Sequence, residues 1–318
     1  MAKIGNLNKE DIVDLSKIKG SIWFDGEIID WQDAKVHLLT HTLHYGLGVF
    51  EGVRAYNTPK GSSIFRLEDH TNRLFKSAET VSMTVPFSQI QLNDAHKQVI
   101  KLNNLTEAYI RPMCFYGSEG MGLRADNLEV HCMVAAWEWP SYMDPEAREK
   151  GIKVKLSSYT RQVRNPVSSA KVNGNYVHSI VALNEALSEG FDEALMLDAE
   201  GNVAEGSGEN IFIVKDNVLI TPDLDASLDG ITRRTILELA KELNIICEIR
   251  KLKTEEVLEA DEAFFSGTAA EVVPINSLDN KQIGAGGRGP ITEQLQSTYF
   301  DQVRGAREAN SNWHTLVE

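Results

Sequence analysis

The stretch Ser168-Ser169-Ala170-Lys171-Val172-Asn173-Gly174-Asn175-Tyr176 places a lysine at the end of a small-residue segment, just where a helical pattern begins. A lysine amine attacks a carbonyl effectively only when its ammonium form is disfavoured, by burial or by a neighbouring cation. The apolar neighbours Ala170 and Val172 suggest such burial. A lysine before a helix is more often solvated than catalytic, so the rest of the chain has to decide between the two interpretations.

Composition and charge are those of a globular protein with room for two domains. The chain has 318 residues, of which 42% are hydrophobic and 25% charged. Its 32 Lys+Arg and 46 Asp+Glu residues give a net charge of -14, which repels phosphate backbones and anionic membrane surfaces. We therefore expect no nucleic-acid and no membrane partner, although an anionic small molecule can still bind a local pocket of arginines and backbone amides.

The cysteines and the first residues bear on the cellular compartment. Cys114, Cys132 and Cys247 are odd in number and lack Cys-x-x-Cys spacing, which predicts neither a disulfide framework nor a zinc site. The first ten residues have no apolar core of signal-peptide length, and no later apolar run approaches about 20 residues. These features together predict a cytoplasmic protein.

The first half of the chain mixes strand and helix patterns. Trp23-Phe24 and Ile28-Ile29, separated by Asp25-Gly26, predict a hairpin, and Val36-His37-Leu38 predicts another short strand. Further strands are expected at Ile64–Leu67, Ala108–Tyr116 and Val130–Trp137, and helices from Glu68 and over Gln89–Asn103. The histidines 37, 41 and 44 have metal-like spacing, but no carboxylate or cysteine completes the set, so we expect no metal.

The second half follows a charged, proline-containing stretch over 143–149, which we interpret as a linker. After Lys171, a helix is predicted with Tyr176, Ile180, Leu183 and Leu187 on one face. The other predicted elements are strands at Ile152–Leu156, Ala194–Asp198, Val203–Val214, Val218–Thr221 and Phe264–Ala270, and helices after Gly230 and over Ile291–Val303.

Several short motifs suggest anion binding, and each is weak alone. Gly206 and Gly208 match the start of a dinucleotide-binding G-x-G-x-x-G, but Ile211 occupies the third glycine position and a strand pattern follows, so we reject that interpretation. The helix after Gly230 offers backbone amides to a phosphate, as every helix start does. Arg66 offers a positive charge, although a surface salt bridge explains it equally well.

The order of the motifs is more informative than any one of them. The chain resembles the class IV, fold-type IV pyridoxal-phosphate enzymes, and among them the branched-chain amino acid aminotransferases. The motifs that carry the resemblance are Arg66, Lys171-x4-Tyr176, Glu205-Gly206-x-Gly208-Glu209-Asn210, Gly230-Ile231-Thr232-Arg233 and Ser266-Gly267-Thr268-Ala269. Further matches are His44-Tyr45-Gly46, Val49-Phe50-Glu51-Gly52, Tyr109-Ile110-Arg111-Pro112, Gly120-Met121-Gly122 and Glu185-Ala186.

The resemblance implies pyridoxal 5'-phosphate as the cofactor. It implies that Lys171 holds the cofactor as a Schiff base and moves the proton at the substrate Cα. Glu205 is implied to keep the pyridine nitrogen protonated, and Tyr176 to donate to the ring hydroxyl oxygen. The implied phosphate ligands are Arg66, the amides of Ile231 and Thr232, and Thr268.

The resemblance also implies an apolar substrate pocket. Its implied members are Phe50, Gly52, Met121, Trp139 and Tyr142, with Tyr45 and Leu123 reaching over from a second subunit. Tyr109 and the Ala269 amide are implied to hold the α-carboxylate, and Arg111 the distal carboxylate of glutamate. Leu123 stands where the family often has a smaller aliphatic residue, and Val172-Asn173 where small residues are usual, which affects the fine specificity rather than the chemistry.

We therefore expect a two-domain α+β protein. A smaller N-terminal α/β domain over 1–142 is followed by a linker over 143–149 and a larger C-terminal domain over 150–318. The cofactor is expected in the cleft between the two domains. The implied function is reversible transamination between leucine, isoleucine or valine and 2-oxoglutarate, giving branched-chain 2-oxo acids and glutamate. The implied assembly is at least a homodimer, and a trimer of dimers is compatible with it.

Three alternatives remain open. A D-amino acid aminotransferase or an aminodeoxychorismate lyase would share Lys171 and Glu205, and a silent binding protein could keep the fold without the chemistry. Tyr109-Ile110-Arg111-Pro112 and Gly120-Met121-Gly122 argue against the first two, and the joint retention of the cofactor residues argues against the third.

Overall fold

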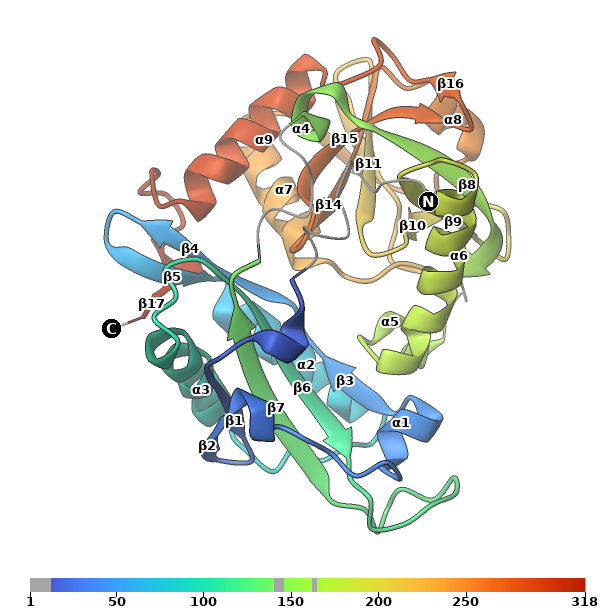
Figure 1. The fold of residues 1–318 in the computed structure, drawn as a ribbon. Coiled ribbons are helices and arrows are strands. Elements are labelled where there is room, and N and C mark those ends of the chain that lie inside the picture. The colour runs from blue at the N-terminus through green and yellow to red at the C-terminus, as the bar shows by residue number, and fades with distance from the viewer. Residues whose placement is uncertain (1–12, 140–145, 162–164, 318) are drawn as a thin grey trace. The chain divides into compact units, whose positions relative to one another are not determined.

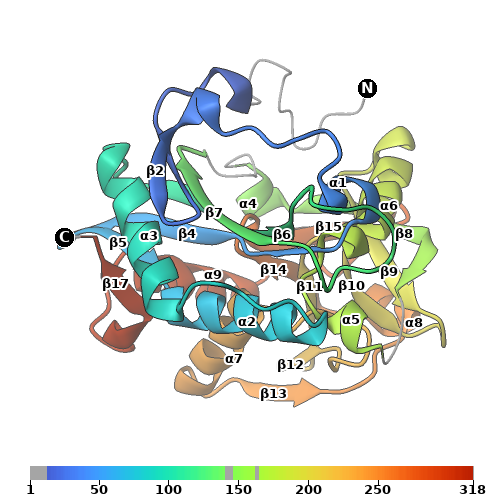
Figure 2. The same ribbon diagram turned by 90° about the horizontal axis from the view of Figure 1, so that it is seen from below.

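The structure is a computed structural model of the chain, and it describes residues 13–139, 146–161 and 165–317. The chain forms two compact units, drawn in Figure 1 and Figure 2. The first unit comprises the described residues 13–139, 170–175 and 302–317, and the second comprises 146–161, 165–169 and 176–301. Both units combine helices with a sheet, so the predicted α+β class is confirmed. The predicted linker begins in residues outside the described part of the chain, so the exact domain boundaries stay a prediction.

The first unit is built on an antiparallel sheet in the order β17-β5-β4-β6-β7-β1-β2, with β3 beside β6. Its strands are β1 (Ser21–Phe24), β2 (Glu27–Asp30), β3 (Gly48–Phe50), β4 (Val53–Thr58), β5 (Gly61–Phe65), β6 (Ala108–Tyr116), β7 (Val130–Trp137) and β17 (His314–Leu316). The predicted hairpin is confirmed, because β1 pairs with β2 across a turn in which Asp25 and Gly26 have φ of 48° and 95°.

Helices cover this sheet and bury its apolar side chains. They are α1 (His41–Tyr45), α2 (Leu67–Thr80) and α3 (Gln89–Leu102), with short 3₁₀ turns η2 (Leu15–Lys17), η3 (Trp31–Asp33), η4 (Asn173–Asn175) and η5 (Ser311–Trp313). The α2 and α3 helices contact each other, and they pack on β3, β7 and β1 (Figure 2). A capping box between Ser88 and Gln91 fixes the start of α3. The helices predicted from Glu68 and Gln89 are therefore confirmed.

The strand predicted at Val36-His37-Leu38 is wrong. These residues form no strand, and Leu38 is 84% exposed. A short apolar run becomes a strand only when a neighbouring strand pairs with it, and the described residues of the first unit provide no such partner here. The apolar side chains of the segment therefore face outward.

A buried ion cluster fixes α2 to the residue that follows β3. Glu51 is fully buried, and its carboxylate receives Arg73 Nε at 2.6 Å, Arg73 Nη2 at 2.8 Å and His70 Nδ1 at 2.8 Å. Burial alone would raise the pKa of Glu51, but the attraction and hydrogen bonds of Arg73, with the His70 bond, hold that pKa well below its usual range. Burial lowers the pKa of His70, so a neutral ring donates to an ionised Glu51.

The second unit contains a mixed sheet in the order β10-β9-β8-β15-β14-β11-β12-β13, with β16 beside β15. The β8–β9, β8–β15 and β12–β13 pairs are parallel. The strands are β8 (Ile152–Arg161), β9 (Glu193–Asp198), β10 (Val203–Gly206), β11 (Asn210–Lys215), β12 (Val218–Thr221), β13 (Ile246–Ile249), β14 (Glu262–Gly267), β15 (Glu271–Leu278) and β16 (Lys281–Gln282). The predicted strand over Val203–Val214 is in fact two strands, because the chain turns at residues 207–209.

Three helices of the second unit lie where the sequence predicts them: α6 (Tyr176–Ser188), α7 (Ile231–Glu242) and α9 (Pro290–Val303), whose last two residues belong to the first unit (Figure 1). The short helices α4 (Ala147–Lys150), α5 (Pro166–Ser169) and α8 (Thr254–Leu258) are not predicted from the sequence, and α4 overlaps the end of the predicted linker. Among the described residues, no helix is long and apolar enough to cross a membrane.

The helix predicted after Lys171 is confirmed as α6, but the face with Tyr176, Ile180, Leu183 and Leu187 is not the face that α6 buries. The residues that α6 buries are Ser179, Ala182 and Ala186, whereas Ile180 is 57% exposed. Small residues let α6 approach β8 and β9 closely, and that close approach decides which face turns inward. Hydrophobic side chains of α6 therefore remain on the outside of the described second unit.

Candidate active site

The backbone of Lys171 is held by the first unit, although the residues on either side of its segment belong to the second. Its N–H donates to Ser77 Oγ on α2 at 3.0 Å, and its carbonyl accepts the N–H of Phe50 at 3.2 Å. Val172 forms a β-bridge with Val49 and is buried in the core of the first unit. Both peptide groups of the lysine are therefore fixed, which leaves only the side chain to move.

The side chain of Lys171 lies beside an aromatic ring that it shares with Arg111. Lys171 Nζ lies 4.8 Å from the centroid of the Phe50 ring, and the Arg111 guanidinium carbon also lies 4.8 Å from it. Arg111 Nη2 donates to Tyr109 Oη at 3.0 Å, and its buried Nε has no hydrogen-bond partner in the described structure. No described carboxylate pairs with Arg111, so its charge is available to a ligand.

Further aromatic side chains lie around Tyr109, next to Arg111. The Tyr109 and Trp139 rings meet edge to face, with centroids 4.5 Å apart. Gly52 is required here, because a Cβ at that position would collide with Tyr109 Oη. The structure thus brings together six of the predicted residues in the first unit: Phe50, Gly52, Tyr109, Arg111, Trp139 and Lys171.

Arg66 lies at the junction of β5 and α2, at the N-cap position of the helix. It has a left-handed backbone, with φ 52° and ψ 39°, and its Nε donates to Asp69 Oδ2 at 2.6 Å. Its guanidinium lies over the ring of Trp313, 4.6 Å from the centroid. The cation is therefore buried and oriented by its surroundings.

In the second unit, Glu205 on β10 is a buried carboxylate with two partners. Arg161, at the end of β8, places Nη2 2.6 Å from Glu205 Oε1, and the Leu228 N–H donates to Oε2 at 2.9 Å. The two partners bind different oxygens of the carboxylate. The side chain of Glu205 is therefore fixed in its orientation.

The N-terminus of α7 and the turn after β14 lie near each other in the second unit. Gly230 is the N-cap of α7, so no side chain caps the amides of Ile231 and Thr232. Asn210 connects the two elements, because it pairs with Ser266 in the sheet and donates from Nδ2 to the Leu228 carbonyl at 2.9 Å. A Cβ on Gly230 would collide with Asn210 Oδ1, which explains the glycine.

The other predicted site residues are more exposed or lie outside the described residues. Thr268 and Ala269 are half-buried in the turn after β14, and Tyr176 is the first residue of α6. Tyr45 on α1 accepts the Gly122 N–H through Oη at 3.2 Å, next to the exposed Met121 and Leu123. Tyr142 lies outside the described residues.

Comparison with known proteins decides the family. The family model described as amino-transferase class IV matches residues 48–278. A branched-chain-amino-acid aminotransferase of Pseudomonas aeruginosa is 58% identical over 300 residues, which cover 94% of this chain and 98% of that protein. The chain belongs to the class IV aminotransferases. The membership predicted from the sequence is therefore confirmed.

Solved structures of the same family agree with this chain in fold. A branched-chain amino acid aminotransferase from Escherichia coli has a TM-score of 0.92 and 42% identity, and the match covers 95% of this chain and 100% of that one. The T.th. enzyme of the same name, complexed with N-(5'-phosphopyridoxyl)-L-glutamate, has a TM-score of 0.91 and 41% identity, with 95% and 99% covered. A second structure of the T.th. enzyme, with pyridoxamine 5'-phosphate, has a TM-score of 0.92 and 42% identity at the same coverage. This aminotransferase therefore has the predicted fold-type IV architecture.

Several residues of this class IV aminotransferase that touch the site were missed in the sequence. Arg161 pairs with Glu205, Ser77 holds the Lys171 backbone, and Trp313 stacks on Arg66. Each is distant in sequence from the residue it contacts, and none belongs to a recognisable motif. Asn210 is the last residue of the motif that begins at Glu205, but nothing in that motif predicts its close approach to Gly230.

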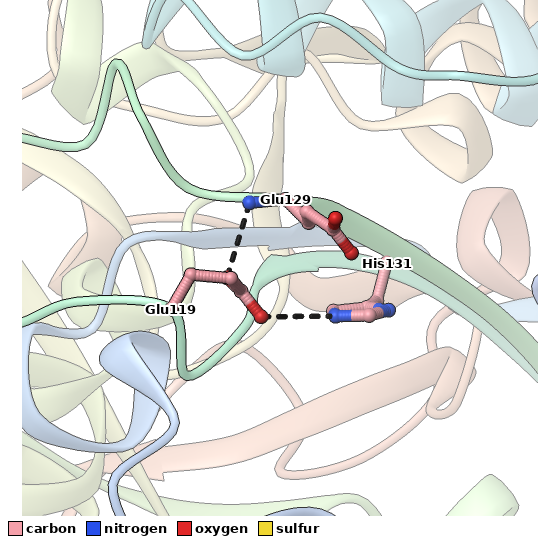
Figure 3. Close-up of side chains that lie close together, drawn as sticks. All are labelled: Glu119, Glu129 and His131. Atoms are coloured by element: carbon pink, nitrogen blue, oxygen red, sulfur yellow. Dashed lines mark hydrogen bonds and ion pairs between the residues drawn. The ribbon is translucent and has the colours of Figure 1, made fainter.

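One cluster of metal-ligand side chains lies away from these residues. Glu119, Glu129 and His131 bring their ligand atoms within 4.8 Å of one another (Figure 3). The Glu119 carboxylate already accepts the Ser118 and Glu129 N–H groups, and His131 Nδ1 lies 2.5 Å from Asp25 Oδ2. Protein groups thus already bind the side chains of Glu119 and His131.

Proposed function

We propose that this chain transfers an amino group reversibly between leucine, isoleucine or valine and 2-oxoglutarate, with pyridoxal 5'-phosphate as its cofactor. The Pseudomonas relative, 58% identical over almost all of both chains, confirms the predicted enzyme class. The solved relatives hold pyridoxamine 5'-phosphate and a phosphopyridoxyl-glutamate adduct, which are the cofactor and the partner amino acid of this reaction. The D-amino acid aminotransferase, the lyase and the silent binding protein are not favoured.

The donor groups of the chain fit such a cofactor. In the second unit, the α7 amides have no side-chain cap, and the buried Ser266 Oγ has no partner in the described structure. In the first unit, Arg66 is a buried, oriented cation. Uncapped helix amides, a hydroxyl and an arginine are the groups that bind a phosphate. We therefore propose Arg66, Ile231 and Thr232 as its ligands, together with Thr268, which lies two residues after Ser266 in the turn that follows β14.

The observation that carries the proposal is the arrangement around Phe50. A lysine amine and an arginine without a described carboxylate partner lie over the same aromatic ring, each 4.8 Å from its centroid. An apolar ring suits a branched side chain, and a guanidinium suits a carboxylate. One pocket with both features accepts leucine and glutamate in turn, as transamination between them requires.

Lys171 and Glu205 are the residues we propose for the chemical step. The bound cofactor supplies an aldehyde for amine exchange and a conjugated ring that takes up electrons from the substrate Cα. Lys171 has its backbone fixed at both peptide groups, so its side-chain amine is positioned to remove and return the proton at Cα. Glu205, held by Arg161 and the Leu228 amide, supplies the negative charge that keeps a ring nitrogen protonated. Tyr176 is proposed to donate to the ring hydroxyl.

For the substrate carboxylates we propose Tyr109 with the Ala269 amide at the α position, and Arg111 at the distal position of glutamate. Arg111→Met is expected to slow the half-reactions of glutamate and 2-oxoglutarate at least about tenfold more than those of leucine and its 2-oxo acid, since an unpaired carboxylate in a pocket is costly. Single-turnover rates followed by cofactor absorbance measure all four.

The matched control for Arg111→Met is Arg124→Met, because Arg124 is an exposed arginine of the same unit that pairs with Asp126. It is expected to leave all four rates unchanged. Equal losses for the four substrates in Arg111→Met would show that Arg111 only supports the sheet, and that the distal carboxylate is bound elsewhere.

We also propose self-association, as at least a homodimer, through an exposed apolar patch of the first unit. The patch consists of Leu38, Leu39, Leu43, Tyr45, Met121 and Leu123, all of them exposed. Two hydrogen bonds join the 38–45 segment of the patch to the 121–123 segment. His41 Nε2 lies 2.8 Å from the Gly122 carbonyl oxygen, and the Gly122 N–H donates to Tyr45 Oη. A contiguous apolar patch built on fixed backbone is typical of an interface between subunits, and it would let Tyr45 and Leu123 reach a neighbour's pocket.

Leu123→Asp tests this assembly, because burying an unpaired carboxylate at an interface is unfavourable. The sedimentation coefficient is expected to shift toward that of the monomer, while Ile90→Asp, on an exposed apolar residue of α3, is expected to leave the assembly intact. A wild-type monomer, or an unchanged assembly in Leu123→Asp, would contradict the patch as the interface.

The predicted cytoplasmic location remains a proposal. The odd number of cysteines, without Cys-x-x-Cys spacing, supports it, because proteins of a reducing compartment rarely depend on disulfides. Recovery of the native protein from an oxidising compartment would contradict it.

The proposed function is tested by comparing amino donors. With 2-oxoglutarate as acceptor, the enzyme is expected to form glutamate from L-leucine, L-isoleucine and L-valine at comparable rates, because one methylene in an apolar pocket changes specificity by only about 1–3 kcal/mol. D-Alanine serves as the control donor. Turnover of D-alanine without turnover of L-leucine would overturn the proposal.

A further inference from the structure

Arg66 occupies a backbone conformation that its residue type does not favour. Its φ of 52° and ψ of 39° lie in the left-handed region, where a side chain is tolerated at a cost and glycine or asparagine is usual. Such a residue persists only where surrounding structure holds it in place, and strained positions of this kind cluster at functional sites.

The holding structure is the end of the chain. Residues 310–316, named here the C-terminal clasp, contain the turn η5 and the strand β17, which pairs with β5 so that His314 lies opposite Phe65 (Figure 1). The Arg66 N–H donates to the Trp313 carbonyl at 2.6 Å. The clasp therefore fixes both the strand that leads into Arg66 and the peptide group of Arg66 itself.

Trp313 also orients the side chain of Arg66. The guanidinium carbon lies 4.6 Å from the centroid of the Trp313 ring, and both residues are buried, at 7% and 6% exposure. Asp69 Oδ2 accepts Arg66 Nε at 2.6 Å. An aromatic ring against the face of a guanidinium and a carboxylate at its Nε together define the orientation of the group. Tryptophan is the aromatic residue that attracts a cation most strongly.

The clasp is itself anchored within the first unit. The Trp313 and Phe65 rings meet edge to face at 5.9 Å, and His314 Nε2 lies 2.8 Å from the Gln302 carbonyl. His314 Nδ1 lies 3.2 Å from Ser63 Oγ on β5. These contacts come from the strand before Arg66 and from the end of α9, so the indole is held on a rigid support.

We propose that Trp313 is a positioning residue that preorganises Arg66 for the phosphate of the cofactor, and that the C-terminal clasp exists to hold it there. This inference rests on the proposed function, in which Arg66 binds that phosphate. A guanidinium that is already oriented loses little freedom when an oxyanion binds, so the indole raises the affinity for phosphate without touching it.

The test compares two ligands that differ only by the phosphate group, pyridoxal 5'-phosphate and pyridoxal. Each is titrated into the full-length apoenzyme and followed by absorbance. Trp313→Leu is expected to weaken pyridoxal phosphate binding about tenfold and to leave pyridoxal binding unchanged, and Trp313→Phe, which keeps a ring, to weaken it about threefold. Leu316→Ala, in the same clasp but on an exposed residue, is the matched control and is expected to change neither.

Arg66→Ala separates this inference from the proposed function. It is expected to lower the affinity ratio of pyridoxal phosphate to pyridoxal, and Trp313→Leu added to it should lower the ratio no further. If Arg66→Ala leaves the ratio unchanged, Arg66 does not bind the phosphate, and that part of the proposed function fails. If Arg66→Ala lowers the ratio but Trp313→Leu weakens both ligands equally or neither, the role of Trp313 is overturned. If Trp313→Leu does not fold, the affinity ratio of pyridoxal phosphate to pyridoxal in Trp313→Phe tests the role of Trp313 instead.

Discussion

Lys171→Ala is expected to abolish steady-state transamination between L-leucine and 2-oxoglutarate, while the chain still folds. We propose the Lys171 amine as the group that exchanges with the substrate amine and moves the proton at Cα, and alanine offers no replacement. Folding is preserved because the contacts of residue 171 with Ser77 and Phe50 use its N–H and carbonyl, which alanine keeps. Turnover, thermal unfolding and cofactor absorbance are the measurements.

The variant is also expected to retain the cofactor without the covalent bond, because the proposed phosphate ligands are other residues. Lys76→Ala is the matched control, since Lys76 is an exposed lysine on α2 of the same unit. It should turn over normally. Normal turnover in Lys171→Ala would remove Lys171 from the mechanism, and a variant that fails to fold would show that the lysine side chain supports the core.

Glu205→Gln is expected to slow the chemical step by about a hundredfold, or about 3 kcal/mol, as is typical when one preorganised electrostatic partner is lost. The amide keeps the shape of the side chain but not its charge, so it could not keep the cofactor ring nitrogen protonated in the role that we propose for Glu205. Arg161 also loses its carboxylate partner, which lay 2.6 Å away. A modest fall in thermal stability should therefore accompany the loss of rate.

Glu209→Gln is the control for Glu205→Gln, because Glu209 is a buried carboxylate four residues away that accepts the Gly208 N–H. Single-turnover rates with L-leucine, followed by absorbance, compare the two variants. If Glu209→Gln lowers the single-turnover rate strongly and Glu205→Gln does not, Glu209 has the role that we propose for Glu205. A stability loss without a rate loss in Glu205→Gln would make Glu205 a structural residue.

Elements with local signals could be predicted from the sequence. The hairpin at Asp25-Gly26 follows from turn residues, and the 89–102 helix from periodicity and its capping box. Local patterns failed where distant partners decide the outcome. Residues 36–38 have no neighbouring strand in the described structure, and α6 turns its small residues inward because β8 and β9 approach it closely.

The candidate site shows the same limit. Lys171, Glu205 and Arg66 could be named because their spacing along the chain resembles a family. The side chains that hold them could not, since Ser77, Arg161 and Trp313 lie 94, 44 and 247 residues away from their partners. Such contacts depend on the tertiary fold, and a single sequence carries no local signal for them.

The most direct test of the central claim is the visible absorbance of the holoenzyme during one half-reaction at a time. Addition of L-leucine alone is expected to convert the absorbance of the lysine-bound cofactor to that of pyridoxamine phosphate, and subsequent addition of 2-oxoglutarate to restore it. The same cycle should be absent in Lys171→Ala. A holoenzyme whose spectrum does not respond to L-leucine, or does not recover with 2-oxoglutarate, would contradict the account.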